Sequence, residues 1–119
     1  MTTEYRTLED LRASLREFVR EREWERFHAP KNLSMALMVE AAELAEHFQW
    51  LDGAESENLD AETRREVTHE LADVLVYLVR LADRLDVDLM QAVSEKMRIN
   101  IEKYPSERVR GSARKYNRY

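Results

Sequence analysis

Apolar residues recur every three or four positions over most of this chain, which is the spacing of helices that bury one face. A first run extends from Leu8 to about Trp24 and follows Thr7-x-x-Asp10, a pattern that resembles a capping box. A second runs from about Leu33 to Leu51, with Asn32 or Ser34 as its N-cap and Gly53 just past its end. The alternation of these runs with polar segments predicts an all-α chain.

Two further helices follow. Asp60 is the expected N-cap of the longest one, which continues to about Leu85, and Asp88 is the expected N-cap of the last, which ends before Pro105. The segments 27–32 and 52–58 are expected to be connections, the first because it contains Pro30. Residues 106–119 form a basic tail. We therefore predict a single all-α domain over residues 1–119, built as a four-helix bundle.

Composition narrows the classes of function. The formal net charge of −5 argues against a stable complex with nucleic acid. The chain has no cysteine, which excludes disulfides and thiolate metal sites. No apolar run is long enough to cross a membrane and the N-terminus lacks the features of a signal peptide, so we expect no membrane partner and a cytoplasmic location.

Two acidic motifs are the strongest chemical signal, and each lies within an apolar helical stretch. They are Glu40-Ala-Ala-Glu43 and Glu70-Leu-Ala-Asp73. Residues i and i+3 share one face of a helix, so two adjacent helices would direct four carboxylates at one small volume. Such a group needs a counter-charge, and Mg²⁺ is usually bound by carboxylates together with substrate phosphates. One such motif alone is more often a solvated surface, but two on neighbouring apolar helices favour a metal site for a phosphorylated ligand.

Aromatic and basic residues lie near these motifs. Trp50 is seven residues after Glu43, and Tyr77 is seven residues after Glu70, so each aromatic continues the line of its motif. Aromatic side chains at helical spacing more often belong to a core, yet they also stack on nucleobases. The candidates for stacking are Trp24, Phe27, Trp50 and Tyr77, and those for phosphate contact are Lys96, Asn100, Lys103 and Lys115. His28, His47 and His69 are not assigned to metal.

With these residues the chain resembles the all-α nucleoside triphosphate pyrophosphohydrolases, the MazG-like and dimeric dUTPase superfamily. The resemblance is closest to its dCTP pyrophosphatase branch and covers about residues 8–116. Besides the acidic motifs, it rests on the segments 21–28, 30–33, 43–50, 70–79, 87–89, 96–97, 103–105 and 111–116, and on Asn100.

The resemblance implies Mg²⁺, with Mn²⁺ as an alternative, held by Glu40, Glu43, Glu70 and Asp73. It implies hydrolysis of a deoxynucleoside triphosphate, dCTP or a modified dCTP, to the monophosphate and pyrophosphate. In-line attack by a metal-bound water requires a general base, for which Glu43 and Glu46 are the candidates. The implied substrate contacts are Trp24, Trp50 and His28 at the base, Tyr77 at the sugar, and Lys96, Asn100 and Tyr104 at the phosphates.

The chain departs from this branch at one position. Leu15 stands where the animal enzymes place a histidine against the base, which makes the base preference an open question. Long apolar stretches such as 71–85 predict more apolar surface than one chain covers, and family members are dimers or tetramers. We therefore expect a homo-oligomer, a tetramer.

Three other functions compete with this hypothesis. The nearest is a MazG-like enzyme of broad specificity for nucleoside triphosphates. Another is a di-iron bundle, because Glu25-x-x-His28 and Glu66-x-x-His69 have its ligand spacing. The last is a non-catalytic helical interaction module whose basic tail binds an acidic partner. Metal-dependent release of pyrophosphate distinguishes a pyrophosphohydrolase from the interaction module, which would release none.

Overall fold

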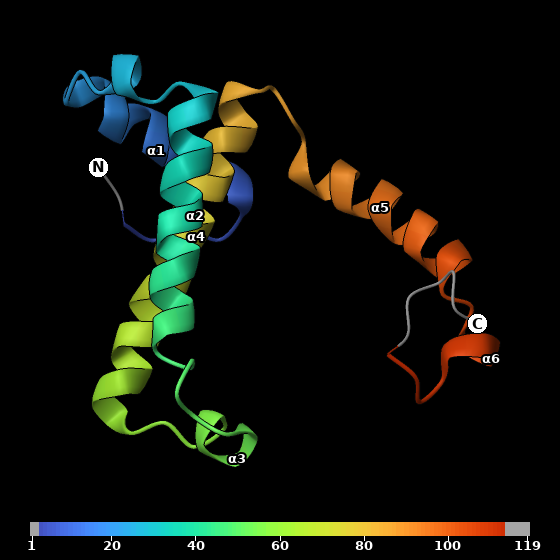
Figure 1. Ribbon diagram of the computed structural model, residues 1–119. Helices are drawn as coiled ribbons and strands as arrows, with labels where there is room; N and C mark the ends of the chain where they lie inside the picture. The colour runs from blue at the N-terminus through green and yellow to red at the C-terminus, as the bar shows by residue number, and fades with distance from the viewer. Residues whose placement is uncertain (1–2, 114–119) are drawn as a thin grey trace. The chain divides into compact units, whose positions relative to one another are not determined.

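The computed structural model describes residues 3–113, and within them every regular element is helical (Figure 1). The chain divides into two compact units, residues 1–86 and residues 87–119. The first unit contains α1 (Leu8–Glu21), the 3₁₀ helix η1 (Glu25–Phe27), α2 (Pro30–Glu46), α3 (Gly53–Ser56) and α4 (Ala61–Arg84). The second contains α5 (Leu89–Lys103) and α6 (Ser106–Val109). The all-α class is confirmed, while the four-helix bundle and the single domain stay predictions.

Short polar side chains fix the N-termini of three long helices, as the sequence predicts. Thr7 Oγ1 accepts a hydrogen bond from the Asp10 backbone N–H at 3.0 Å. Asp60 does the same for Thr63 at the start of α4, and Asp88 does so for the first turn of α5. Each cap satisfies a backbone donor that has no partner within its helix.

The second predicted helix is shifted along the sequence. α2 begins at Pro30, three residues before the predicted start, and its N-cap is Ala29 rather than Asn32 or Ser34. Pro30 occupies the first helical position, where a proline loses nothing, because the backbone N–H it lacks would have no helical partner there. The Asn32 side chain instead donates to the Phe27 carbonyl at 3.3 Å, which ties η1 to the start of α2.

α2 also ends earlier than predicted, at Glu46 rather than Leu51, and the predicted polar loop at 52–58 contains α3. Asp52 and Glu55 form a capping box: each side chain accepts a hydrogen bond from the other residue's backbone N–H. The extended backbone at Asp52 that this box requires cannot continue α2. The segment between Glu46 and Asp52 therefore forms turns.

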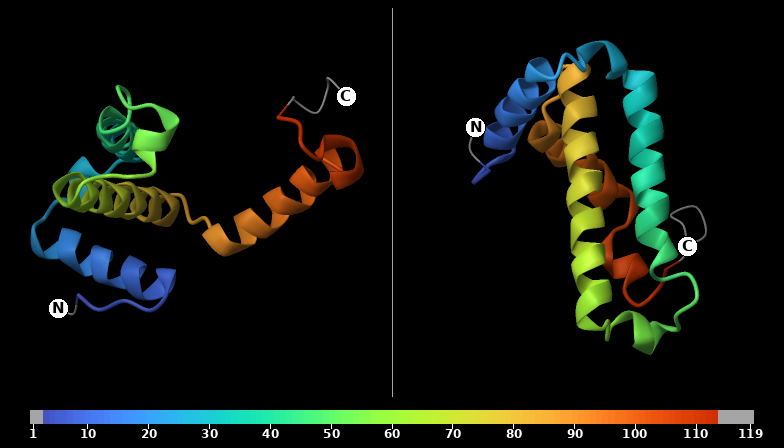
Figure 2. Two further views of the ribbon diagram at one scale, coloured as in Figure 1. Left: turned by 90° about the horizontal axis from the view of Figure 1, so that it is seen from below. Right: turned by 90° about the vertical axis from the view of Figure 1, so that its left-hand side faces the viewer.

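α4 is the central element of the first unit, with α2 packed on one side and α1 on the other (Figure 2). The hydrophobic core of this unit is small and is formed by residues of α1, α2 and α4. The buried apolar residues are Leu11, Val19, Leu33, Val67, Val79 and Ala82. Several apolar side chains of α4 lie outside this core, among them Leu71, which is 54% exposed.

The second unit consists of α5 and α6, and neither helix has a buried residue. Val93, Met97 and Ile101 recur along α5 and are all exposed. Within residues 3–113, no helix has both the length and the apolar character needed to cross a membrane.

Candidate active site

Three of the four predicted metal-binding carboxylates meet between α2 and α4. Glu40 and Glu43 come from α2, and Glu70 comes from α4. One carboxylate oxygen of each lies within 4.8 Å of those of the other two. The i,i+3 spacing places Glu40 and Glu43 on one face of α2, and packing of α2 against α4 brings that face to Glu70. We call Glu40, Glu43 and Glu70 the acidic cluster.

The negative charge of Glu40 is unfavourable in this cluster. Burial, followed by the adjacent carboxyl groups of Glu70 and Glu43 and by the charge of Asp73, raises the pKa of Glu40 to about 7. The Oε2 atoms of Glu40 and Glu70 are buried and have no hydrogen-bond partner among the described residues. Buried polar atoms normally have a partner, and a cation between these carboxylates would supply one.

The cluster has the right atoms for a magnesium ion. Mg²⁺ prefers oxygen ligands at about 2.1 Å, which places the ligand atoms of an octahedron about 3–4 Å apart. Carboxylate oxygens within 4.8 Å of one another need only small rotations of their side chains to reach that arrangement. Glu40, Glu43 and Glu70 can therefore hold Mg²⁺ or an ion of similar chemistry.

Asp73 and Glu46, the remaining predicted acids, lie outside this group. Asp73 is exposed on α4, one turn after Glu70, and its charge contributes to the raised pKa of Glu40. Glu46 is exposed at the last position of α2, one turn after Glu43. Their roles as fourth metal ligand and as general base stay predictions.

A second contact between α2 and α4 lies beside the cluster. His47 is the C-cap of α2, and its Nδ1 lies 3.7 Å from a carboxylate oxygen of Glu66 on α4. Glu66 precedes Glu70 by one helical turn. The end of α2 therefore lies against α4 close to the acidic cluster.

The predicted aromatic residues differ in their placement. Trp24 follows the end of α1, where its ring meets that of Phe18 edge-on with centroids 5.8 Å apart. Tyr77 is half-buried on α4. Trp50 is 87% exposed and lies in the turn after α2, so the prediction that it continues the helical line of Glu43 is wrong. Their contacts with a nucleotide stay predictions.

His28 lies in a basic environment. Its Nδ1 accepts a hydrogen bond of 3.4 Å from Nε of the buried Arg80. Burial, and then the charges of Arg80 and Arg84, lower the pKa of His28. Neighbouring guanidinium groups oppose the binding of a metal cation. In addition, Glu25 begins the 3₁₀ helix η1 and His28 is its C-cap, so the two residues do not share an α-helix. This arrangement disfavours the di-iron alternative at Glu25 and His28.

The predicted phosphate contacts belong to the second unit. Lys96 and Asn100 lie one turn apart on α5, with Lys96 exposed and Asn100 half-buried. Lys103 ends α5, and Tyr104 is its C-cap. Lys115 lies outside the described residues. All of these phosphate contacts stay predictions.

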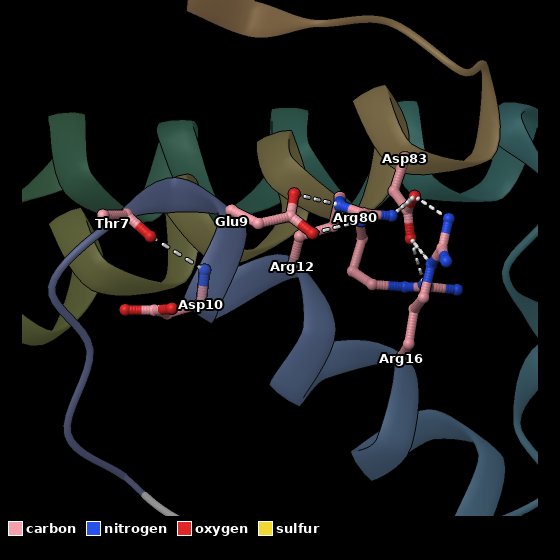
Figure 3. Close-up of polar contacts among 7 residues, drawn as sticks. All are labelled: Thr7, Glu9, Asp10, Arg12, Arg16, Arg80 and Asp83. Carbon is pink, nitrogen blue, oxygen red and sulfur yellow. Dashed lines mark hydrogen bonds and ion pairs between the residues drawn. The ribbon is translucent and has the colours of Figure 1, made fainter.

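Sequence reasoning missed one cluster of charged side chains, which joins α1 to α4 (Figure 3). Arg16 binds the Asp83 carboxylate through Nε at 2.7 Å and Nη2 at 2.6 Å, and Arg12 donates to it at 3.0 Å. Arg12 also pairs with Glu9. Arg80 contacts Asp83 more weakly, at 3.5 Å. In the sequence, the only sign of this cluster is that two charged residues, Arg80 and Asp83, lie among the apolar residues of α4.

Comparisons with known proteins identify the family of this chain. The MazG-like family model matches residues 35–118. This chain belongs to the MazG-like family. The predicted resemblance is thereby confirmed.

Named MazG-like relatives include the dCTP pyrophosphatases 1 of rat and human, which are 50% and 49% identical to this chain over 112 residues. Those residues are 92% of this chain but 66% of each relative, so the chain spans slightly less than two thirds of their length. The crystal structure of a pyrophosphatase from Archaeoglobus fulgidus superposes with a TM-score of 0.75 at 38% identity. That alignment covers 88% of this chain and 98% of the archaeal chain.

Proposed function

We propose that this MazG-like chain is a Mg²⁺-dependent pyrophosphohydrolase of deoxynucleoside triphosphates, with dCTP or a modified dCTP as its substrate. The observation that carries the proposal is the acidic cluster, which gathers three carboxylates and leaves two buried oxygens without a partner. The names of the rat and human relatives, dCTP pyrophosphatase 1, support the choice of substrate.

In the proposed reaction, the oxygen of a water molecule bonds to the α-phosphorus. The bond from that phosphorus to the α,β-bridging oxygen breaks, and pyrophosphate leaves with the bridging oxygen. Mg²⁺, when bound, would neutralise phosphate charge and lower the pKa of the attacking water. The acidic cluster, with Asp73 as a fourth ligand, would hold the ion, and Glu43 or Glu46 would accept the proton that the water releases. Glu46 is suited to this role because its exposed carboxylate lies outside the cluster.

The nucleoside and phosphate contacts follow the resemblance to the dCTP pyrophosphatases. We assign Trp24, Trp50 and His28 to the base and Tyr77 to the sugar. On the same resemblance we assign Lys96, Asn100 and Tyr104 to the phosphates. We add Lys103 and Lys115, for which the resemblance implies no role, because their ammonium groups suit phosphate oxygens. Leu15 is half-buried on α1, where it offers an apolar surface in place of the imidazole of the animal enzymes. An apolar side chain discriminates weakly between bases, because it has no polar atom that a wrong base would leave without a hydrogen-bond partner.

The proposal includes a homo-oligomer, for which we infer a tetramer. Leu71, Leu75 and Leu78 lie on one face of α4, and each is at least 38% exposed. On α2, Met35 and Met38 are more than half exposed. Apolar rows of this kind on two helices favour association with a second copy of the chain. A monomeric mass by light scattering at micromolar concentration would contradict this part of the proposal.

The decisive experiment measures pyrophosphate release from dCTP, 5-methyl-dCTP, dUTP, dATP and the ribonucleotides, in Mg²⁺ and in EDTA. We expect turnover of the dCTP compounds in Mg²⁺ alone. Glu43→Gln should abolish it, whereas Glu57→Gln, at an exposed position after α3, should not. Equal rates across bases would favour the enzyme of broad specificity. No release from any nucleotide would favour the non-catalytic interaction module.

A further inference from the structure

A basic pocket lies within the first unit where the C-terminal parts of α1 and α4 meet η1. Its volume is about 280 Å³, and its lining residues are Arg16, Arg20, Glu25, Arg80, Asp83 and Arg84. Four guanidinium groups therefore face two carboxylates in a chain whose net charge is −5. We call this cavity the arginine pocket.

Arg80 is the buried member of the arginine pocket, with 5% of its side chain exposed. Its contacts are long: 3.4 Å to the neutral acceptor Nδ1 of His28 and 3.5 Å to Asp83. Burial lowers the pKa of Arg80, although the charge of Asp83 opposes this effect. A buried guanidinium normally has close charge-assisted hydrogen bonds at about 2.7–2.9 Å. Arg80 thus has less compensation than its burial requires.

Asp83 has little capacity left to compensate Arg80. Both of its oxygens accept hydrogen bonds from Arg16 at 2.7 Å or less, and one of them also accepts from Arg12 (Figure 3). Arg20 and Arg84 also line the pocket, and their exposed side chains make no hydrogen bond or ion pair with any residue of the described range 3–113. The pocket therefore carries an excess of positive charge with unused donors.

We propose that the arginine pocket binds a phosphate-type oxyanion, inorganic phosphate or pyrophosphate, between Arg20, Arg80 and Arg84. Guanidinium groups match this chemistry, because their planar N–H pairs bind phosphate oxygens in a bidentate manner. An anion with two or more charges balances the excess of two guanidinium groups over carboxylates and gives Arg80 a close partner.

This site is distinct from the acidic cluster. Arg80 follows Glu70 by ten residues on the uninterrupted helix α4, a separation of about 15 Å along the helix axis. No residue that lines the arginine pocket belongs to the acidic cluster. Binding at the arginine pocket therefore requires no metal, and it is measured with the acidic cluster empty of ions.

The experiment titrates the full chain with phosphate and with pyrophosphate in EDTA by calorimetry, with sodium chloride at matched ionic strength as the blank. We expect saturable binding of at least one of the two anions. The double variant Arg20→Gln/Arg84→Gln should weaken anion binding about tenfold or more, because each substitution removes a charged hydrogen-bond donor. The matched control is Arg64→Gln/Arg65→Gln, which removes two exposed arginines at the other end of α4.

Two further measurements locate the anion in the arginine pocket. Glu25→Gln removes a lining carboxylate, so the anion should bind several-fold more tightly. The imidazole of His28 should titrate at higher pH when the anion is bound, because the anion offsets the charges of Arg80 and Arg84.

Three results would overturn the proposal. The first is no binding of either anion to the native chain beyond the chloride blank. The second is an equal loss of binding in the control pair, which would indicate non-specific charge attraction. The third is anion binding that Arg20→Gln/Arg84→Gln leaves unchanged, since the anion would then bind outside the arginine pocket.

Discussion

Glu40 on α2 and Glu70 on α4 each bury one carboxylate oxygen that has no hydrogen-bond partner among the described residues, although their carboxylates lie within 4.8 Å of each other. Two like charges at this distance repel, and burial strengthens the repulsion. In the folded chain without metal, the repulsion between these two carboxylates therefore lowers the stability. This makes the stability of the fold depend on pH and on metal.

The first prediction concerns pH. The pKa of Glu40 is raised from 4.5 to about 7 in the folded chain, so the proton that Glu40 binds there stabilises the fold. That stability is full below pH 4.5 and is lost as the pH rises through 7. We expect the melting temperature in EDTA to fall between pH 5 and pH 8. Glu40→Gln, which cannot ionise, should show a smaller fall in circular dichroism melts.

The control for this pH effect is Glu57→Gln, which removes an exposed carboxylate outside the cluster. Its melting temperature should follow the native pH profile. An identical profile for Glu40→Gln would show that the charge of Glu40 is not the source of the pH dependence.

The second prediction concerns metal. Mg²⁺ competes with the proton for the acidic cluster, so it should raise the melting temperature more at pH 8 than at pH 5. At a concentration of one hundred times the dissociation constant, binding to the folded state alone adds about 2.7 kcal/mol. Glu70→Gln should lose most of this gain by removing a ligand from α4. A full Mg²⁺ response in Glu70→Gln would contradict the assignment of Glu70 to the metal.

The four long helices, and the N-caps of all of them except α2, could be predicted from sequence because they depend on local periodicity and short polar residues. Asp60 and Asp88 are examples, since each caps the helix that the apolar pattern places after it. The acidic cluster was also predictable, because its residues share helix faces at a fixed spacing. The end of α2 was not: an apolar pattern continues through Phe48 and Trp50, and the backbone leaves the helix because Asp52 caps α3.

The cluster around Asp83 was beyond prediction for a different reason. Arg12 and Arg16 are separated from Asp83 by more than sixty residues in the sequence, and only packing of α1 on α4 brings them together. In a helical sequence rich in Arg and Glu, most charged residues are solvated, so nothing in the neighbouring sequence distinguishes Asp83 from a solvated residue.

The third prediction concerns the end of α1. Glu23 adopts a left-handed backbone with φ of 54°, and the Trp24 N–H bonds the Val19 carbonyl at 3.0 Å, which is the pattern of a Schellman motif. This conformation is costly for residues with a Cβ and free for glycine. Glu23→Gly should therefore raise the free energy of unfolding, by about 0.5 kcal/mol in urea titrations, because the relief of strain exceeds the extra entropy of the unfolded chain.

The matched control is Glu21→Gly, two residues earlier at the last helical position of α1. The same substitution there should lower the free energy of unfolding by about 0.5–1 kcal/mol, because glycine is unfavourable within a helix. Equal effects of the two variants would mean that the backbone of Glu23 carries no strain.

The fourth prediction concerns Asp83, whose side chain is 6% exposed. Hydrogen bonds from Arg16, and then from Arg12, lower its pKa against the effect of burial. Asp83→Asn leaves Arg16 and the buried Arg80 without their counter-charge, whereas Arg12 keeps its pair with Glu9, and the loss should cost about 3 kcal/mol at pH 7. Because the pKa of Asp83 is lowered, its contribution to stability is present above pH 4 and is lost as the pH falls through that lowered pKa, so the stabilities of the two chains should converge in acid.

The source of that loss can be identified by a second substitution. If the uncompensated charge of Arg80 destabilises Asp83→Asn, then adding Arg80→Met should recover part of the stability, although Arg80→Met alone removes a partner of Asp83. Asp86→Asn is the matched control, since Asp86 is exposed with φ of 55°, a conformation that asparagine tolerates. It should change the stability by no more than about 0.5 kcal/mol. Additive losses in the double variant would instead attribute the effect of Asp83 to its hydrogen bonds with Arg12 and Arg16 alone.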